Sequence, residues 1–265
     1  MPPVESWRET IATTKQLGRI LIRGVLTLFV VADAFAFEPR CPTAVPMHLD
    51  LPATRTAIAH DQAITIVALG SSSTEGAGAS APDRTYPARL EALLRANWPD
   101  DHVTILNRGI GGQTVDAVLP RLGTDVIAAR PTLVIWQIGT NEVLRDMDPA
   151  RFDALLDEGL RRLATIGSDV VLMDYQIAPR MPPEAKREIY GGIIAREARA
   201  HSVALFSRAA LMRSWRATDP TTSDMIGPDG LHHSDRGYAC LAASLDSAIV
   251  AATAPRVAVV SVKLK

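Results

Sequence analysis

The chain has 265 residues, of which 47% are hydrophobic and 22% are charged, the composition of an ordinary globular protein with a full core. Its formal net charge at pH 7 is −1, which argues against nucleic acid or an anionic membrane surface as its main partner. We therefore expect one substantial domain that acts on something other than a nucleic acid.

The first 36 residues resemble an export signal rather than part of the fold. Basic residues precede a short apolar run, Gly24–Ala32, and a small-x-small ending at Ala34–Ala36. A membrane span needs about 20 apolar residues, so we expect no integral span in the mature chain. We predict a signal peptide or export segment over 1–36, cleavage after Ala36 and a secreted or periplasmic protein. The alternative is a buried or amphipathic N-terminal helix.

Residues 37–61 are rich in proline, threonine and alanine and show no sustained periodicity, so we expect an extended segment on the surface. The two cysteines, Cys41 and Cys240, both lie beyond the expected cleavage point. An even number of cysteines in an exported protein favours a disulfide between them. The alternative is two unrelated buried thiols.

From residue 62 to residue 252, short apolar runs alternate with segments of helical periodicity, and we expect 253–265 to be a C-terminal tail. This alternation predicts an α/β domain with a mainly parallel sheet and helices on both faces. The five expected strands are 64–69, 103–106, 133–136, 170–173 and 203–206. Helices are expected over 115–126, after the cap Asp148-Pro149, and from Ser234 onward.

Three candidate residues follow three of these strands directly. Ser72 lies after the first, Gly112 after the second and Asn141 after the third. Ligands of parallel sheets bind beyond the carboxyl ends of the strands, so the three loops are expected to converge on one edge. Asp229 and His232 lie in the loop before the last helix, which can fold over the same edge.

A serine hydroxyl needs a neighbouring base in order to attack, and the base is usually a histidine that a carboxylate orients. The run Asp229-Gly230-Leu231-His232 supplies both groups, and Gly230 allows the turn between them. We predict Ser72 as nucleophile, His232 as base and Asp229 as its orienting group. The alternative is an exposed loop with an incidental Asp and His.

The remaining histidines have other expected roles. His233 competes with His232 but would point elsewhere, and we interpret it as a rim residue. The other four have no carboxylate at useful spacing and are interpreted as structural or solvated: His48, His60, His102 and His201. No cluster has metal-ligand spacing, so we expect no metal and no cofactor.

The tetrahedral intermediate of acyl transfer needs hydrogen-bond donors for its oxyanion. We predict the backbone N–H groups of Ser72 and Gly112 and the side chain of Asn141 for this oxyanion hole. Each has an ordinary alternative, a tight-turn glycine or a turn-capping asparagine. Rival motifs fail. Gly70–Gly76 lacks the P-loop lysine, Gly109-x-Gly111-Gly112 lacks the third glycine of a dinucleotide-binding loop, and Thr74 breaks a Gly-x-Ser-x-Gly elbow.

Together these segments resemble the SGNH (GDSL) hydrolase family over roughly residues 62–252. Its four motifs are similar to Gly70–Gly76, Gly112, Gly139-Thr140-Asn141 and Asp229–His232. The resemblance implies a flavodoxin-like three-layer α/β/α sandwich without a cofactor, and the roles given above for the five site residues. Two positions depart from the pattern, Ser71 and Glu142, where the family usually has aspartate. We expect Ser71 to loosen local support of the loop and Glu142 to alter the polarity of the pocket.

The expected function is an exported serine esterase that hydrolyses acyl esters through an acyl-enzyme intermediate. The substrate would be a small-molecule or carbohydrate ester, such as an acetylated sugar, or a small lipid ester. Two alternatives remain: an O-acyltransferase acting on envelope glycans, and a catalytically silent glycan-binding module.

Overall fold

A computed structural model describes residues 41–99, 102–219 and 222–254. Five parallel strands form one sheet in the order β2-β1-β3-β4-β5. The predicted α/β architecture and all five predicted strands are therefore confirmed. The strands are β1 Ile64–Gly70, β2 Val103–Gly109, β3 Leu133–Gln137, β4 Asp169–Met173 and β5 Ala204–Phe206.

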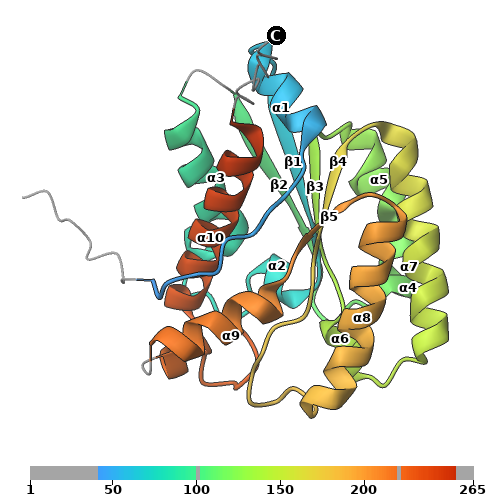
Figure 1. The fold of residues 1–265 in the computed structure, drawn as a ribbon, viewed down its shortest axis with the longest axis vertical. Helices are drawn as coiled ribbons and strands as arrows, with labels where there is room; N and C mark the ends of the chain where they lie inside the picture. The colour runs from blue at the N-terminus through green and yellow to red at the C-terminus, as the bar shows by residue number, and fades with distance from the viewer. Residues whose placement is uncertain (1–40, 100–101, 220–221, 255–265) are drawn as a thin grey trace, which may run out of the picture. The chain divides into compact units, whose positions relative to one another are not determined.

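Helices cover both faces of this sheet and complete a three-layer α/β/α sandwich. Figure 1 shows α3 and α10 on one side of the strands and α4, α5, α7 and α8 on the other. The α-helices are α1 Pro52–Ala59, α2 Ser72–Glu75, α3 Tyr86–Asn97, α4 Val115–Val118, α5 Leu122–Asp125, α6 Thr140–Leu144, α7 Pro149–Leu163, α8 Glu184–Ala200, α9 Arg208–Thr218 and α10 Asp235–Thr253. The 3-10 helices are η1 Pro82–Arg84, η2 Leu119–Arg121, η3 Ile127–Ala129, η4 Ala164–Ile166 and η5 Thr222–Met225.

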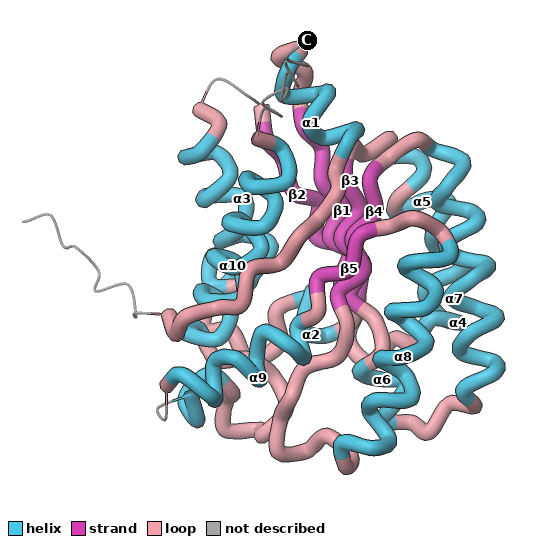
Figure 2. Tube along the Cα trace, in the orientation of Figure 1, coloured by secondary structure: helices cyan, strands magenta, loops and turns pink. Residues whose placement is uncertain are grey.

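The strands form because their apolar runs are buried on both faces. Every residue of β3 and β4 is buried, as expected of central parallel strands between two helical layers. Trp136 and Phe152 are among the largest side chains of this core, and both are fully buried. The sheet therefore provides a rigid frame whose carboxyl ends carry the loops of interest. Figure 2 shows these loops gathered at the lower end, around α2 and α6.

Two predicted helix starts are confirmed by their caps. The Asp148 side chain accepts a hydrogen bond from the N–H of Arg151 at 2.8 Å, and Pro149 follows it as the first residue of α7. Ser234 caps α10 by accepting from the N–H of Gly237 at 3.2 Å. This second cap fixes where the loop that carries His232 meets the last helix.

The continuous helix expected over 115–126 is wrong in detail, because the segment is broken into α4, η2 and α5. The break falls at Pro120, which has no N–H to donate within a helix. The predicted apolar face survives the break: Val115, Val118, Leu122 and Val126 are all buried.

The extended segment expected over 37–61 is also corrected, because residues 52–59 form helix α1. Pro52 starts the helix, and the Asp169 carboxylate accepts from the N–H groups of Ala53 and Thr54 at 3.1 and 2.7 Å. A residue of β4 thus satisfies the free donors at this helix start. The export segment predicted over 1–36 lies outside the described residues.

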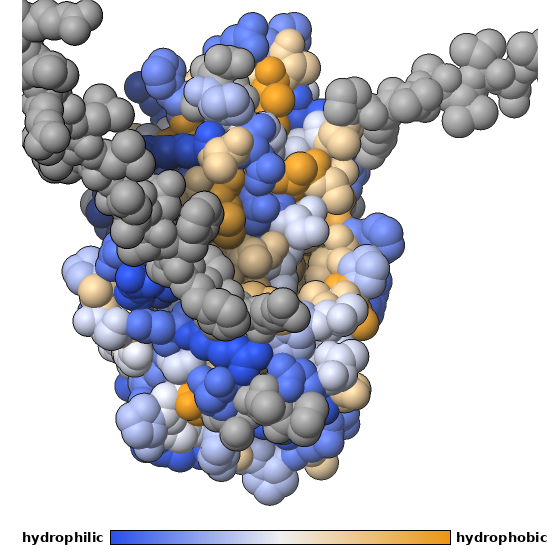
Figure 3. Space-filling view, turned by 90° about the vertical axis from the view of Figure 1, so that its left-hand side faces the viewer, coloured by the Kyte–Doolittle hydropathy of each residue, from blue (hydrophilic) through white to orange (hydrophobic). Residues whose placement is uncertain are grey.

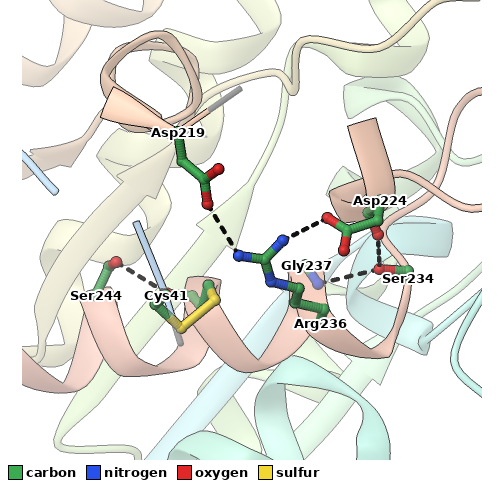
Figure 4. The surroundings of a disulfide bond; sticks show 8 residues. Cys41, Asp219, Asp224, Ser234, Arg236, Gly237 and Ser244 are labelled. Atoms are coloured by element: carbon green, nitrogen blue, oxygen red, sulfur yellow. Dashed lines mark hydrogen bonds and ion pairs between the residues drawn. A yellow bond between two sulfur atoms is a disulfide. The ribbon is translucent and has the colours of Figure 1, made fainter. Parts of the chain in front are cut away.

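The predicted disulfide is confirmed, since Cys41 is bonded to Cys240 in α10. Figure 4 shows the surroundings of the bond. Arg236, one turn before Cys240, contacts Asp219 at 3.1 Å and Asp224 at 2.6 Å. The start of the described chain and the segment after α9 are therefore both attached to α10.

Removing this disulfide should destabilise the protein strongly. The bond joins residues separated by 199 positions, and the chain-entropy account assigns a loop of this length up to about 5 kcal/mol. We expect a Cys41→Ser/Cys240→Ser variant to unfold at clearly lower denaturant concentration than the oxidised protein. Reduced wild-type protein is the control and should match the variant. An unchanged unfolding midpoint would contradict this prediction.

None of the helices in the described part of the chain combines the length and hydrophobicity needed to cross a membrane.

Candidate active site

Ser72 lies at the point where β1 ends and the short helix α2 begins. The preceding residue, Ser71, is buried, and its backbone N–H and its hydroxyl both donate to Gln137 Oε1 at 3.0 Å. This contact attaches the loop after β1 to the end of β3. The Ser72 hydroxyl is held at the carboxyl edge of the sheet, where the first N–H groups of α2 are free of partners within the helix.

The loop before α10 brings His232 and Asp229 to the same edge. His232 Nε2 lies 2.8 Å from Ser72 Oγ, and His232 Nδ1 lies 2.5 Å from Asp229 Oδ2. The other carboxylate oxygen, Oδ1, accepts from the N–H groups of Leu231 and His232, each at 3.0 Å. Gly230 makes this tight turn with a φ of +68°, a left-handed conformation that favours glycine.

The electrostatics of this pair favour one arrangement of protons. Burial alone would raise the pKa of Asp229, but the hydrogen bonds from the Leu231 N–H and from His232 outweigh it and lower the pKa to about 2. The carboxylate is therefore ionised at neutral pH and accepts a hydrogen bond from the N–H at His232 Nδ1. Nε2 is left as an acceptor that faces the Ser72 hydroxyl. This arrangement can remove the hydroxyl proton during an attack on a carbonyl carbon.

Gly112 and Asn141 lie in two neighbouring loops at this edge. Gly112 has a φ of +74°, and its α-carbon faces the guanidinium of Arg145. Asn141 is buried, and its Nδ2 donates to the Gln113 carbonyl at 2.7 Å. This hydrogen bond brings the two loops into direct contact. Because an amide nitrogen carries two hydrogens, one hydrogen of Asn141 Nδ2 remains for another acceptor.

Replacing Gly112 by alanine should impair the site more than the fold. Alanine disfavours the φ of +74°, and its Cβ would lie 3.0 Å from Arg145 Nη2. We expect kcat for an ester substrate to fall by about tenfold or more, because small displacements of oxyanion donors are costly. Gly123→Ala is the matched control, since a Cβ at that position meets nothing within 4 Å. Equal kcat values for the two variants would contradict the prediction.

Arg121 is a supporting residue that the motifs did not indicate. Its Nη2 donates to the Gly70 carbonyl at 3.1 Å, its Nη1 to the Arg108 carbonyl at 2.9 Å and its Nε to Gln113 Oε1 at 2.7 Å. It therefore braces the ends of β1 and β2 and the Gly112 loop together. Gln137 was missed as well, although a polar residue at the end of an apolar strand is a signal that could have identified it.

The interpretation of His233 as a rim residue is wrong, because its side chain is fully buried. It packs against Trp215 and Tyr238, and its Nδ1 lies 3.3 Å from the Met225 carbonyl. Burial, reinforced by the charge of Arg208, lowers the pKa of His233 to about 3. His233 is therefore a neutral core residue, and it does not compete with His232 as a base.

His201 also differs from expectation, because it does have carboxylate partners. Its Nε2 lies 2.9 Å from Asp157 Oδ1 and 3.7 Å from Glu197 Oε2. These three residues form a group with the donor types of a metal site. Each carboxylate also pairs with an arginine, Asp157 with Arg161 and Glu197 with Arg196. The group can be explained as an ion-pair network between α7 and α8.

The expectation that Glu142 alters the polarity of the pocket is wrong. Its side chain is buried, with 2% of the residue exposed, and both carboxylate oxygens accept backbone N–H groups. Burial raises the pKa of Glu142 to about 7, although hydrogen bonds from its own N–H and those of Val115 and Gly139 oppose the rise. Ser71 was expected to loosen local support of the loop. In the structure, its backbone N–H and its hydroxyl both donate to Gln137 Oε1.

The candidate site is partly exposed to solvent. The side chain of Asp229 is 40% exposed and that of His232 is 16% exposed. A cavity of about 640 Å³ lies elsewhere, between α1, the start of β4 and the start of β5. Its lining contains none of the five predicted site residues.

A parallel α/β/α sandwich with a serine, histidine and aspartate in hydrogen-bond contact at its carboxyl edge is the architecture of the SGNH class of hydrolases. A family model supports this class: that of the non-GDSL lipase-like family matches residues 40–255. The match covers most of the chain, so the chain belongs to this family. The resemblance drawn from the four motifs is confirmed.

The individual relatives match only part of this chain. Esterase TesA of Pseudomonas aeruginosa is 31% identical over 111 residues, which cover 40% of this chain and 55% of that protein. An acetylxylan esterase of Geobacillus stearothermophilus is 40% identical over 63 residues, which cover 24% and 29% of the two chains. The chain thus spans about half or less of the length of these two relatives.

Among solved structures, a two-domain esterase active on acetylated mannans superposes with a TM-score of 0.68 and 20% sequence identity. The superposition covers 80% of this chain and 56% of that one. At this identity the comparison shows the shared fold alone.

Proposed function

We propose that the protein is a serine esterase that hydrolyses acyl esters through an acyl-enzyme intermediate. The observation that carries this proposal is the continuous contact from Ser72 Oγ to His232 Nε2 and from His232 Nδ1 to Asp229. Gly112 and Asn141, in two further loops, are the proposed oxyanion donors together with the N–H of Ser72. Family membership supports the same assignment.

In the proposed mechanism, Ser72 Oγ attacks the carbonyl carbon of the ester while His232 Nε2 takes the hydroxyl proton. The oxyanion forms against the donors of Ser72, Gly112 and Asn141. Collapse of this intermediate breaks the bond to the alcohol, which leaves with the proton from His232. Water then attacks the acyl-enzyme with the same base, and the acid and free Ser72 are regenerated.

We propose short acyl groups on carbohydrates as the substrate class. A partly exposed triad leaves room for a bulky alcohol such as a sugar chain, whereas a long acyl chain favours an enclosed apolar pocket. Polar residues predominate over the lower part of the face drawn in Figure 3, toward the end where the strands finish. The similarity to an acetylxylan esterase supports the same class.

We also propose that the protein is exported, with residues 1–36 as the signal. The disulfide supports this location, because such bonds persist mainly in oxidising compartments. Finding the intact N-terminus on protein recovered from its native cell would contradict the proposed cleavage.

A substrate panel tests the proposed function. It compares 4-nitrophenyl acetate, butyrate and octanoate with acetylated xylo- and manno-oligosaccharides. We expect release of free acetate from the sugars and a preference for acetate over octanoate. Acylated sugar formed from an added acceptor would instead indicate a transferase. Binding of the sugars without turnover of any ester would indicate a silent glycan-binding module.

A further inference from the structure

Glu142 is a buried carboxylate that touches neither Ser72 nor His232 among its hydrogen-bond partners, yet it contacts both loops of the proposed oxyanion hole. Its Oε1 accepts from the N–H of Val115 at 2.8 Å, and its Oε2 accepts from the N–H of Gly139 at 2.9 Å. Val115 follows the Gly112 loop, and Gly139 opens the Asn141 loop. One carboxylate therefore bridges two segments that come from different strands.

A second contact runs beside this bridge. Asn141 Nδ2 donates to the Gln113 carbonyl at 2.7 Å. Two consecutive residues of α6 thus reach the segment just after Gly112, one through its side-chain amide and the other through its carboxylate. Two adjacent contacts restrict rotation as well as separation, so the donors on Gly112 and Asn141 are fixed relative to each other.

We propose that Glu142 is a positioning residue, which holds the Gly112 and Asn141 donors at the mutual distance that an oxyanion requires. This inference rests on the proposed esterase function and adds to it a residue that does not touch the substrate. Removing the bridge should affect the transition state, in which the oxyanion exists, more than the binding of the uncharged ester.

The surroundings of Glu142 make this bridge sensitive to pH. The ends of β1 and β3, with Ser71 directly after β1, contribute only uncharged neighbours beside it, namely Gly70, Ser71, Trp136 and Gln137. Helix α4 contributes Asp116, whose negative charge adds to the effect of burial and which pairs with Arg151 of α7 at 2.9 Å. Helix α8 contributes Tyr190, whose pKa is raised mainly by burial and, to a smaller degree, by the Glu142 charge.

The sign of the pH effect follows from the ionised form. A carboxylate accepts both backbone N–H groups, whereas a protonated carboxyl loses one strong acceptor. Because the pKa of Glu142 is raised to about 7, the bridge is complete above this pH and weakens as the pH falls below it. On the acid side, activity should therefore decline as Glu142 becomes protonated, in addition to the decline expected of any mechanism that uses a general base.

The test measures kcat and KM for 4-nitrophenyl acetate across pH in wild-type protein, Glu142→Gln, Glu142→Asp and the control Glu188→Gln, a matched change at an exposed position of α8. For Glu142→Gln we expect kcat to fall about 10- to 100-fold, with KM changed by less than about threefold. The acid side of the profile of kcat against pH should fit two ionisations in wild-type protein and one in this variant. Glu142→Asp keeps the charge but is shorter, so it should show an intermediate kcat and two ionisations.

Wild-type kcat in Glu142→Gln, or the same acid side of the profile in that variant and wild-type protein, would overturn the proposal. If Glu142→Gln does not fold, as judged by near-UV circular dichroism, the decision passes to Glu142→Asp. A reduced kcat with two ionisations then supports positioning, and an unchanged kcat overturns it. A wild-type protein without ester turnover would instead refute the proposed function.

Discussion

Replacing Ser72 by alanine should reduce kcat/KM for 4-nitrophenyl acetate by at least about 10⁴-fold. The hydroxyl lies 2.8 Å from His232 Nε2, and without it no acyl-enzyme can form. Binding and the oxyanion donors would remain, so a small residual rate is expected. The fold should survive, because alanine is compatible with the first turn of α2 and Ser72 is only half-buried.

The adjacent Ser73→Ala variant is the control for this experiment. Ser73 is buried beneath the site, and no motif gives it a role in the chemistry. It should retain most of the wild-type activity. Undiminished turnover in Ser72→Ala, or an equal loss in Ser73→Ala, would contradict the assignment of the nucleophile.

Replacing Asp229 by asparagine should lower kcat by about 10⁴-fold, because an amide at this position favours the wrong histidine tautomer. The side-chain NH₂ would face His232 Nδ1, so the proton would move to Nε2 and the acceptor opposite Ser72 would be lost. The measurement is kcat at neutral pH. Asp83→Asn, at a side chain that is 76% exposed, is the matched control and should leave kcat unchanged.

The pH dependence separates Asp229 from the other groups of the site. Its pKa in the folded protein is lowered to about 2 from an ordinary value of 3.8. The stabilising interaction with His232 is therefore complete above the ordinary value and is lost only as the pH falls toward 2. Protonation of Asp229 therefore does not account for a loss of activity between pH 7 and pH 5, whereas protonation of Glu142, whose pKa is raised to about 7, does contribute to it. A kcat in Asp229→Asn close to that of wild-type protein would contradict the assigned role.

The fold was predictable because its signals are local. Strands such as Ile64–Gly70 and Leu133–Gln137 are apolar runs that a parallel sheet buries on both faces. The contact between Ser72 and His232 was predictable for a similar reason. Both lie in short motifs beside strand or helix ends, and the topology of a parallel sheet brings such ends to one edge.

The features that were missed depend on partners far away in the sequence. The first N–H groups of helix α1 donate to the carboxylate of Asp169, more than a hundred positions away. Glu142 was interpreted as a pocket residue from its place in the motif, but it is bound to the N–H of Val115, which starts α4 and is 27 positions away. The burial of His233 likewise depends on α9, which no local pattern relates to it. Long-range contacts of this kind need coordinates.

The most direct test of the central proposal is peptide mapping by mass spectrometry after reaction with a fluorophosphonate. The probe forms a covalent bond only with a serine that a neighbouring base activates, and it needs no knowledge of the natural substrate. We predict a single adduct on the peptide that contains Ser72, and its loss in His232→Ala. No adduct on the folded protein, or an adduct at a different side chain, would contradict the proposed mechanism.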